Sequence, residues 1–284
     1  MPEEHSYQPD PDREIETYDL IEETSAVPGL PGSSVVAETI DKLMDFVTRD
    51  LCHHAMQTVQ EFGDFHLALS GGRTPLPLYQ RLMIDPDCRL MPWRRTHLWM
   101  VDERCVPPTD PQSNYPDLDE TIVAHADIPR EQVHPIMAMS ETADVDYEKQ
   151  IHEALEWRED ETERRMDYVL LGMGEDGHTA SLFPHTPALG EKERWIRFNT
   201  SMDASPAERI TMTYPIINTA RFVAILVTGS NKAAMIQRVA SGEDTFEDLP
   251  ILGARPTNGM LRWYLDKAAC ATGLLDEKAE ADDE

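Results

Sequence analysis

Asp176 and His178 are the two side chains best suited to acid–base chemistry, and they stand two residues apart in the stretch GEDGH. An imidazole is the side chain that most readily gains and loses a proton near neutral pH. A carboxylate this close in the sequence can share one turn with the imidazole and orient it. The pair is therefore a candidate catalytic site, and the alternative is an ordinary solvated loop histidine.

A strand, a tight turn and a helix are predicted to position this pair. The apolar run at 168–171 predicts a buried strand, which is broken by Gly172, Gly174 and Gly177. A helix is predicted to begin at Thr179. Because ligands of open α/β sheets bind at the carboxyl ends of the strands, we expect this loop at the ligand-binding edge.

A second glycine turn, SGGRTP at 70–75, follows a short apolar run that predicts a strand. The backbone N–H groups of Gly71 and Gly72 can approach an anion closely, and the dipole of the helix predicted to follow favours negative charge. The turn is thus a candidate phosphate cradle, with Arg73 beside it. It lacks the spaced Gly-Lys-Ser/Thr of a Walker A loop.

Arg104 ends the charged tripeptide DER, directly after the strand predicted over 96–101. Three charges at the end of a strand are costly to bury without partners. Arg104 either reaches an anion at the edge of the site or forms an internal ion pair with Asp102 or Glu103. The anion is favoured because the glycine turn at 70–75 is predicted to lie nearby.

Two more basic residues stand at the ends of predicted elements. Arg209 lies at the entrance of the strand predicted over 206–214. Lys232 follows the strand predicted over 221–227 and begins a helix, where the dipole opposes a cation. Lys232 is therefore either a solvent-exposed lysine or an anion ligand, and its position favours the second.

Strands that alternate with helices and end in glycine turns predict an α/β fold, with a doubly wound, mostly parallel sheet and helices on both faces. The first long helix is predicted from Ser33 or Ser34 to Phe62. A charged surface helix is predicted over 144–165. The segment 259–269 is predicted to be a closing strand or helix.

The chain of 284 residues has 25 basic and 53 acidic side chains and a formal net charge of −28. We expect one α/β domain over 34–270, between an acidic, flexible extension at 1–33 and an acidic tail at 271–284. Such a surface makes nucleic acid and anionic membranes poor partners. Because no apolar run is long enough to span a bilayer and the N-terminus lacks a signal-peptide pattern, we expect a cytoplasmic protein. The cysteines have no metal or redox spacing: Cys52, Cys88, Cys105 and Cys270.

Five stretches, in this order along the chain, resemble the 6-phosphogluconolactonase family, which is related to the glucosamine-6-phosphate deaminases: SGGRTP at 70–75, DER at 102–104 with SN at 113–114, LGMGEDGHTASLFP at 171–184, RITMTYP at 209–215 and VTGSNK at 227–232. The third stretch is the most specific. The deaminases typically continue the Gly-His loop as Ile-Ala-Phe-Asn-Glu-Pro, whereas this chain continues it as Thr-Ala-Ser-Leu-Phe-Pro. They also have tyrosine where this chain has Arg104.

The resemblance implies a Rossmann-like fold with no metal and no organic cofactor, and hydrolysis of 6-phospho-D-glucono-1,5-lactone in the pentose phosphate pathway. It implies His178 as the general base, with Asp176 beside it, and Arg104 and Lys232 as phosphate ligands. The other residues of the expected site assist in binding the phosphate, stabilising the oxyanion or supporting the loops: Gly71, Gly72, Arg73, Asp102, Gly174, Gly177 and Arg209.

Two other functions remain open. In a deaminase or isomerase of an amino sugar phosphate, Asp102 is the base at C2, and Asp176 and His178 open the ring. In a sugar-phosphate-binding regulator the same pocket binds without turnover, although an intact Asp176–His178 pair argues against binding alone. In each case the predicted partner is a small phosphorylated sugar, and the predicted assembly is a monomer or a small homo-oligomer.

Overall fold

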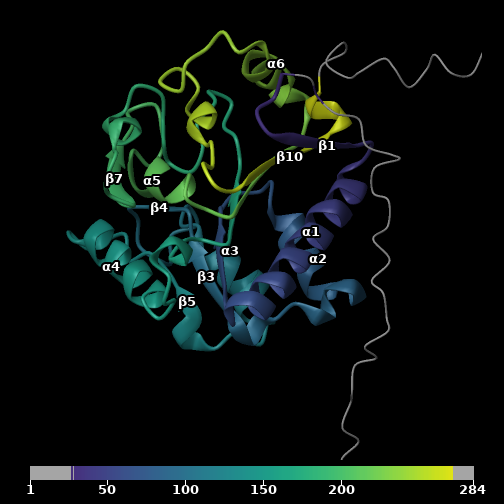
Figure 1. Cartoon of the computed structure of the whole chain (residues 1–284). Helices are drawn as coiled ribbons and strands as arrows, with labels where there is room; N and C mark the ends of the chain where they lie inside the picture. Colours follow the sequence, from purple (N-terminus) through teal and green to yellow (C-terminus); the bar gives the residue numbers. More distant parts are fainter. Residues whose placement is uncertain (1–26, 28, 271–284) are drawn as a thin grey trace, which may run out of the picture.

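A seven-stranded parallel sheet forms the centre of the computed structural model, which describes residue 27 and residues 29–270 (Figure 1). Each strand is parallel to its neighbours. In spatial order the strands are β1 (Ser33–Ala37), β10 (Met260–Asp266), β9 (Phe222–Val227), β6 (Tyr168–Leu171), β2 (Phe65–Leu69), β3 (Thr96–Met100) and β5 (Val133–His134).

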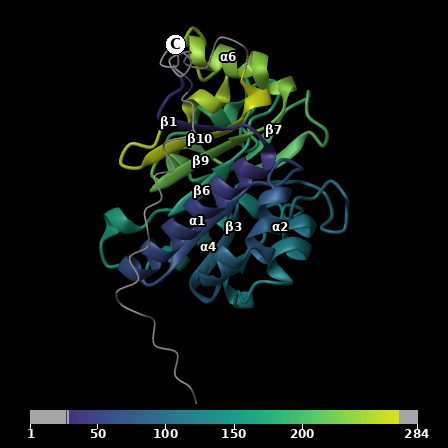
Figure 2. The ribbon, with the colours of Figure 1, turned by 90° about the vertical axis from the view of Figure 1, so that its right-hand side faces the viewer.

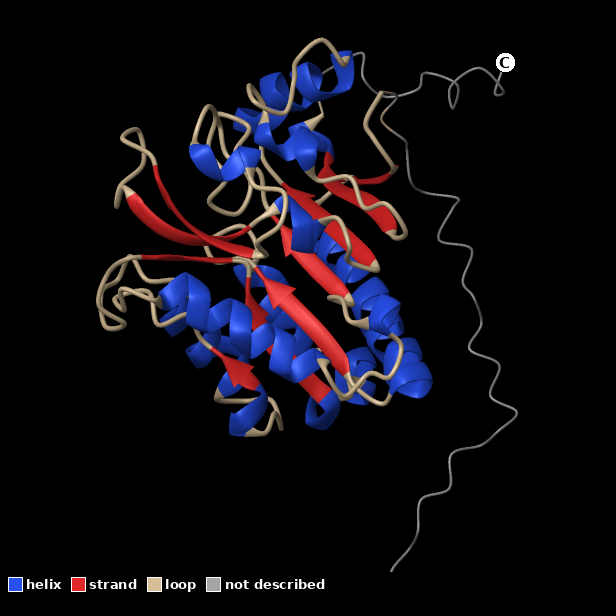
Figure 3. Ribbon diagram, turned by 60° about the vertical axis from the view of Figure 1, so that its left-hand side comes forward, coloured by secondary structure: helices blue, strands red, loops and turns tan. Residues whose placement is uncertain are grey.

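Helices lie on both sides of this sheet (Figure 3), as the α/β prediction requires. Strands β2, β6 and β9 are buried at every position, which explains why their sequences are apolar throughout, except for His66, rather than alternating. The long helix that crosses the sheet in Figure 2 packs against β1, β2 and β10. The helices are α1 (Ile40–Phe62), α2 (Leu76–Ile84), α3 (Tyr115–Leu118), α4 (Ala143–Leu155), α5 (Tyr214–Ile217) and α6 (Ala233–Ser241).

A second, antiparallel sheet adjoins the carboxyl end of β3. Its strands lie in the order β4 (Asp102–Arg104), β8 (Glu208–Met212) and β7 (Ile196–Thr200). Val101 connects the two sheets, since its N–H donates to the Leu69 carbonyl and its carbonyl accepts from the Met212 N–H. The small sheet is thereby fixed at the edge where the central strands end.

The predicted start of the first helix at Ser33 or Ser34 is wrong. Residues 33–37 form β1, which pairs with β10, and α1 begins only at Ile40. The Thr39 side chain caps it by accepting from the Lys42 N–H at 3.2 Å. The end of the helix at Phe62 is confirmed, with Gly63 in the left-handed conformation at φ 89°.

The helix predicted to begin at Thr179 is also absent. Residues 179–182 instead form a tight turn closed by an isolated bridge between Thr179 and Leu182. Ala180 has a left-handed backbone with φ 48°, which no α-helix can accommodate. The Ser181 N–H donates to the Thr211 hydroxyl at 3.0 Å, so the small sheet holds this segment away from helical geometry.

The charged helix predicted over 144–165 ends at Leu155. The chain then turns so that Arg158, which is only 3% exposed, reaches into the protein. Its guanidinium donates to Asp64 at 2.8 Å and to Asp167 at 2.7 Å and 3.0 Å. A continued helix would remove Arg158 from both buried carboxylates, and only Asp167 would keep another guanidinium, that of Arg221 at 2.9 Å.

The remaining predicted strands are confirmed, and the segment over 259–269 contains the strand β10. Residues 1–26, 28 and 271–284 lie outside the described residues, so the acidic extension and the acidic tail stay predictions. Val27 and Leu30 are buried, and the Trp263 indole donates to the Pro31 carbonyl at 2.9 Å. Within the described part of the chain, no helix has the length and apolarity needed to cross a membrane.

Candidate active site

The carboxyl ends of the central strands face the small sheet across a cleft of about 490 Å³. Its walls come from the turn after β2, from β4, from the loop after β6 and from the segment leading into β8. Two predicted site residues, Gly177 and Lys232, are not among its lining residues. The others do line it: Gly71, Gly72, Arg73, Asp102, Arg104, Gly174, Asp176, His178 and Arg209.

His178 and Asp176 form a hydrogen-bonded pair at this cleft. The His178 Nδ1 and the Asp176 Oδ1 are 2.6 Å apart, and the same oxygen accepts from the His178 backbone N–H at 3.2 Å. Burial alone raises the pKa of Asp176, but the hydrogen bonds and charge of His178 outweigh it and place that pKa below its usual value. An ionised carboxylate only accepts, so in the neutral imidazole Nδ1 carries the proton and Nε2 has the free lone pair.

Gly174 is required by this pair. A Cβ atom at Gly174 would lie 2.1 Å from the His178 Nδ1 and 2.5 Å from the Asp176 Oδ1. Gly177 has φ 80°, and a Cβ there would lie 2.7 Å from Leu249. The N–H groups of the two glycines donate inside the turn, to the His178 and Gly174 carbonyls, so their role is to shape the loop. The N–H groups of these two glycines are thus engaged within the turn, and the oxyanion role of the turn stays a prediction.

Arg104 and Arg209 lie directly opposite each other on the antiparallel strands β4 and β8. Neither guanidinium has a carboxylate within ion-pair distance among the described residues. Arg104 donates to the Gln112 carbonyl, and Arg209 donates to the Pro206 carbonyl. Like charges directly opposite each other destabilise a sheet. Two cations without a carboxylate partner among the described residues, both lining the cleft, are suited to binding an anion.

The alternative of an internal ion pair at the DER tripeptide is not found. The Glu103 carboxylate is 2% exposed and accepts instead from the Ser113 hydroxyl and from three backbone N–H groups. Burial raises the pKa of Glu103, although these hydrogen bonds oppose the shift. Asp102 accepts from the Ser181 hydroxyl at 2.6 Å. The two acids thus have hydrogen-bond donors without the Arg104 guanidinium.

Lys232 immediately precedes α6 and is half-buried, outside the lining of the cleft. Burial lowers its pKa, and the carboxylates of Glu175 and Asp176 oppose that shift. The neighbouring Asn231 amide donates to Glu175 at 2.8 Å and so links this segment to the loop of the pair. The phosphate role of Lys232 stays a prediction. Arg73 is exposed and lines the cleft.

A family model described as glucosamine-6-phosphate isomerases/6-phosphogluconolactonase matches residues 38–263. The chain belongs to this family. A 6-phosphogluconolactonase of Haemophilus influenzae is 32% identical over 239 residues, which cover 80% of this chain and 98% of that protein. The GDH/6PGL endoplasmic bifunctional protein of Homo sapiens is 38% identical, but the chain spans only 30% of its length.

A solved structure gives the same picture of the fold. The crystal structure of 6-phosphogluconolactonase from Thermotoga maritima superposes with a TM-score of 0.69 at 30% identity. The match covers 82% of this chain and the whole of that one. The family resemblance predicted from the five sequence stretches is therefore confirmed.

Sequence reasoning did not assign three further residues at the cleft. The Phe183 ring lies 4.7 Å from the His178 ring and 5.9 Å from the Arg209 guanidinium, so it separates the base from a cation. Asn114 packs so tightly on Gly71 that a Cβ there would lie 2.0 Å from its Oδ1. Ser181 is the third. All three stand inside stretches that carry the family resemblance, which was the one available signal.

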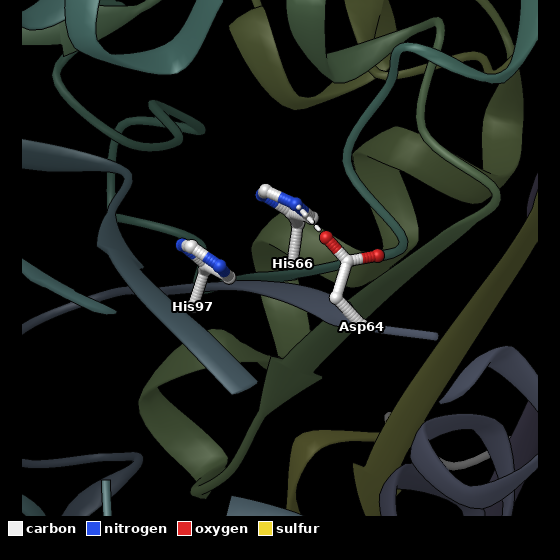
Figure 4. A group of neighbouring side chains, drawn as sticks. All are labelled: Asp64, His66 and His97. Carbon is white, nitrogen blue, oxygen red and sulfur yellow. Dashed lines mark hydrogen bonds and ion pairs between the residues drawn. The ribbon is translucent and has the colours of Figure 1, made fainter. Parts of the chain in front are cut away.

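Away from the cleft, three neighbouring side chains are of types that can bind a metal (Figure 4): Asp64, His66 and His97. The His66 Nε2 lies 2.8 Å from the Asp64 Oδ2, and its Nδ1 accepts from the Trp99 indole at 3.1 Å. The Arg158 guanidinium already neutralises Asp64. Because both nitrogens of His66 are engaged and a fixed cation is adjacent, this cluster fits a hydrogen-bonded core better than a metal.

His97 of this cluster and the neighbouring His134 predict that the protein loses stability in acid. Burial lowers the pKa of His97 to about 4 and that of His134, which stacks on Trp99, to about 3. Both lie below the unfolded value of about 6.5, so the unfolded state binds more protons and stability falls as pH drops from about 6.5 towards 4. Each histidine contributes a slope of up to about 1.4 kcal/mol per pH unit.

Urea unfolding at pH 7 and pH 5 measures this slope. His134→Phe keeps a ring on Trp99 but cannot titrate, so its free energy of unfolding should fall less between the two pH values than that of the wild type. An equal fall in both proteins would contradict the assignment of the slope to His134.

Proposed function

We propose that this chain hydrolyses 6-phospho-D-glucono-1,5-lactone to 6-phosphogluconate in the oxidative branch of the pentose phosphate pathway. The observation that carries the proposal is the juxtaposition at one cleft of a carboxylate-oriented histidine and two arginines that have no ion-pair partner in the described part of the chain. The substrate has matching ends, a phosphate dianion and a lactone carbonyl. The relatives of this chain include proteins named 6-phosphogluconolactonase, whose length the chain covers almost completely.

The phosphate binds first to the cationic wall. Arg104 and Arg209 supply charge, and the Gly71–Gly72 turn at the cleft supplies backbone that can approach closely. Arg73 and Lys232 are predicted to assist. Binding the remote dianion holds the lactone carbonyl beside His178, which converts the attack of water into a positioned reaction.

The chemical step needs one base. The Nε2 of His178 takes a proton from water, and the resulting hydroxide forms a bond to the lactone carbonyl carbon. The tetrahedral intermediate collapses by breaking the bond to the ring oxygen, and His178 returns its proton to that oxygen. Asp176 keeps Nδ1 protonated and stabilises the imidazolium while it exists. The products are a carboxylic acid, ionised at neutral pH, and the ring-opened hydroxyl.

A coupled assay of lactone disappearance above spontaneous hydrolysis tests the proposal. We expect acceleration by the wild-type chain and its loss in His178→Ala. Ammonia release from glucosamine 6-phosphate would instead make the chain a deaminase. Tight binding of 6-phosphogluconate without turnover of the lactone would make it a binding protein. The cytoplasmic location, the absence of nucleic acid and membrane partners, and the small assembly size stay predictions.

Lys232→Ala tests the outlying phosphate ligand. If the lysine reaches the phosphate when substrate is bound, KM for the phosphorylated lactone should rise by up to about tenfold with little change in kcat, because a ligand of the ground state and transition state alike is lost. Steady-state kinetics on the phosphorylated and unphosphorylated lactones measure this. An equal loss on both substrates would argue against a phosphate contact.

A further inference from the structure

Ser181 lies three residues after His178 and is 1% exposed. Each of its polar groups bonds to a different strand of the small sheet. Its N–H donates to the Thr211 hydroxyl of β8 at 3.0 Å, and its hydroxyl donates to the Asp102 Oδ2 of β4 at 2.6 Å. Its carbonyl accepts from the Asn199 amide of β7 at 2.8 Å. Both backbone polar groups of Ser181 are thus hydrogen-bonded to the small sheet.

These bonds join the two functional halves of the cleft. The loop after β6 carries the base His178, whereas β4 and β8 carry Arg104 and Arg209. The loop has no regular structure of its own beyond its turns, so its position over the small sheet depends on specific contacts. Ser181 is the residue through which all three strands hold it.

We propose that Ser181 is a positioning residue that sets the distance between the base and the phosphate-binding arginines. The inference rests on the proposed function and adds to it the residue that makes phosphate binding productive. A phosphorylated lactone bridges both halves, so its reaction depends on their spacing. An unphosphorylated lactone contacts only the half with the base, so its reaction does not.

The hydroxyl of Ser181 acts here as a hydrogen-bond donor and not as a nucleophile. It points to the Asp102 carboxylate, which is 7% exposed and has one other side-chain donor, the Asn114 amide at 3.5 Å. The Nδ1 of His178 is bonded to Asp176 and not to Ser181. Without the Ser181 hydroxyl, Asp102 loses its short donor and the loop loses its tie to β4.

Ser181→Ala tests the inference. We expect kcat/KM for 6-phosphogluconolactone to fall by about tenfold or more, since small displacements of a base from a bound substrate are costly. For unphosphorylated glucono-δ-lactone kcat/KM should stay within about twofold. The inhibition constant of inorganic phosphate should also stay within about twofold, because the arginines remain. Ser181→Thr keeps the hydroxyl and should restore most of the activity on the phosphorylated substrate.

Ser113→Ala is the matched control. The Ser113 hydroxyl also donates to a buried carboxylate of β4, the Glu103 Oε2 at 2.9 Å, but it does not hold the loop of His178. Ser113→Ala should leave the ratio of kcat/KM on the two lactones unchanged, even if the melting temperature of the variant falls. The same ratio in Ser181→Ala as in the wild type would overturn the inference, as would abolished turnover of both lactones in Ser181→Thr. A wild-type chain without lactonase activity would instead overturn the proposed function.

Discussion

Replacing His178 by alanine is expected to lower kcat by about 10²- to 10⁴-fold and to change KM by no more than about threefold. The imidazole accepts a proton only as the water attacks, so its loss removes an interaction of the transition state and spares substrate binding. The Nδ1 contact with Asp176 at 2.6 Å leaves Nε2 as the reacting atom. Stopped or continuous assay of the lactone, corrected for spontaneous hydrolysis, measures the effect.

His185 offers a matched control for this variant. It is another loop histidine near a carboxylate, with its Nε2 at 3.7 Å from the Asp248 Oδ1, but its side chain is 69% exposed and does not line the cleft. His185→Ala should keep the wild-type kcat. If His178→Ala kept it too, the imidazole would have no part in the reaction, and another group would have to act as the base.

The part of the site that could be predicted from sequence is the part encoded locally. The run at 168–171 is apolar at every position, and Gly174 and Gly177 follow it at once, so a strand and a turn could be predicted. The rule that parallel strands end at one edge then brings this turn beside Gly71 and Gly72. Both segments line the cleft, as this rule predicts.

The errors have a common cause, which is that distant partners decided the local conformation. Residues 33–37 form a strand because β10, more than 220 positions later, offers an edge to pair with. Val36 and Ile40 stand four apart, so the pattern imitates a helix. The hydrogen-bond partners of Ser181 are separated from it by 79, 30 and 18 positions in the sequence, and no local pattern predicts these bonds.

The register of β4 against β8 could not be predicted from the sequence either. Arg104 and Arg209 were each a basic residue at the end of a predicted strand, and only the pairing shows that they lie opposite each other. This changes the interpretation of both residues. An isolated arginine has many possible uses, whereas two adjacent arginines without a carboxylate partner among the described residues repel each other, and a bound anion would relieve that repulsion.

Arg209→Met is therefore expected to lower kcat/KM for the phosphorylated lactone by about 30-fold or more, mainly through KM. Losing one partner of a buried charged contact costs about 2 kcal/mol or more. Arg209 is 5% exposed, and burial together with the charge of Arg104 lowers its pKa, so an anion bound between the two would be poorly screened. Activity on the unphosphorylated lactone should change little, and steady-state kinetics on both substrates measure the difference.

Thermal unfolding separates an anion site from a structural role for the same residue. Inorganic phosphate should raise the melting temperature of the wild type by binding only the folded state, and this increment should shrink in Arg209→Met. Arg197→Met is the control, since Arg197 belongs to the same sheet but is paired with Glu191 at 3.4 Å and lies outside the cleft lining. It should keep the full increment. An undiminished increment in Arg209→Met, with equal losses on both lactones, would mean that Arg209 only supports the strand, and that the phosphate binds elsewhere.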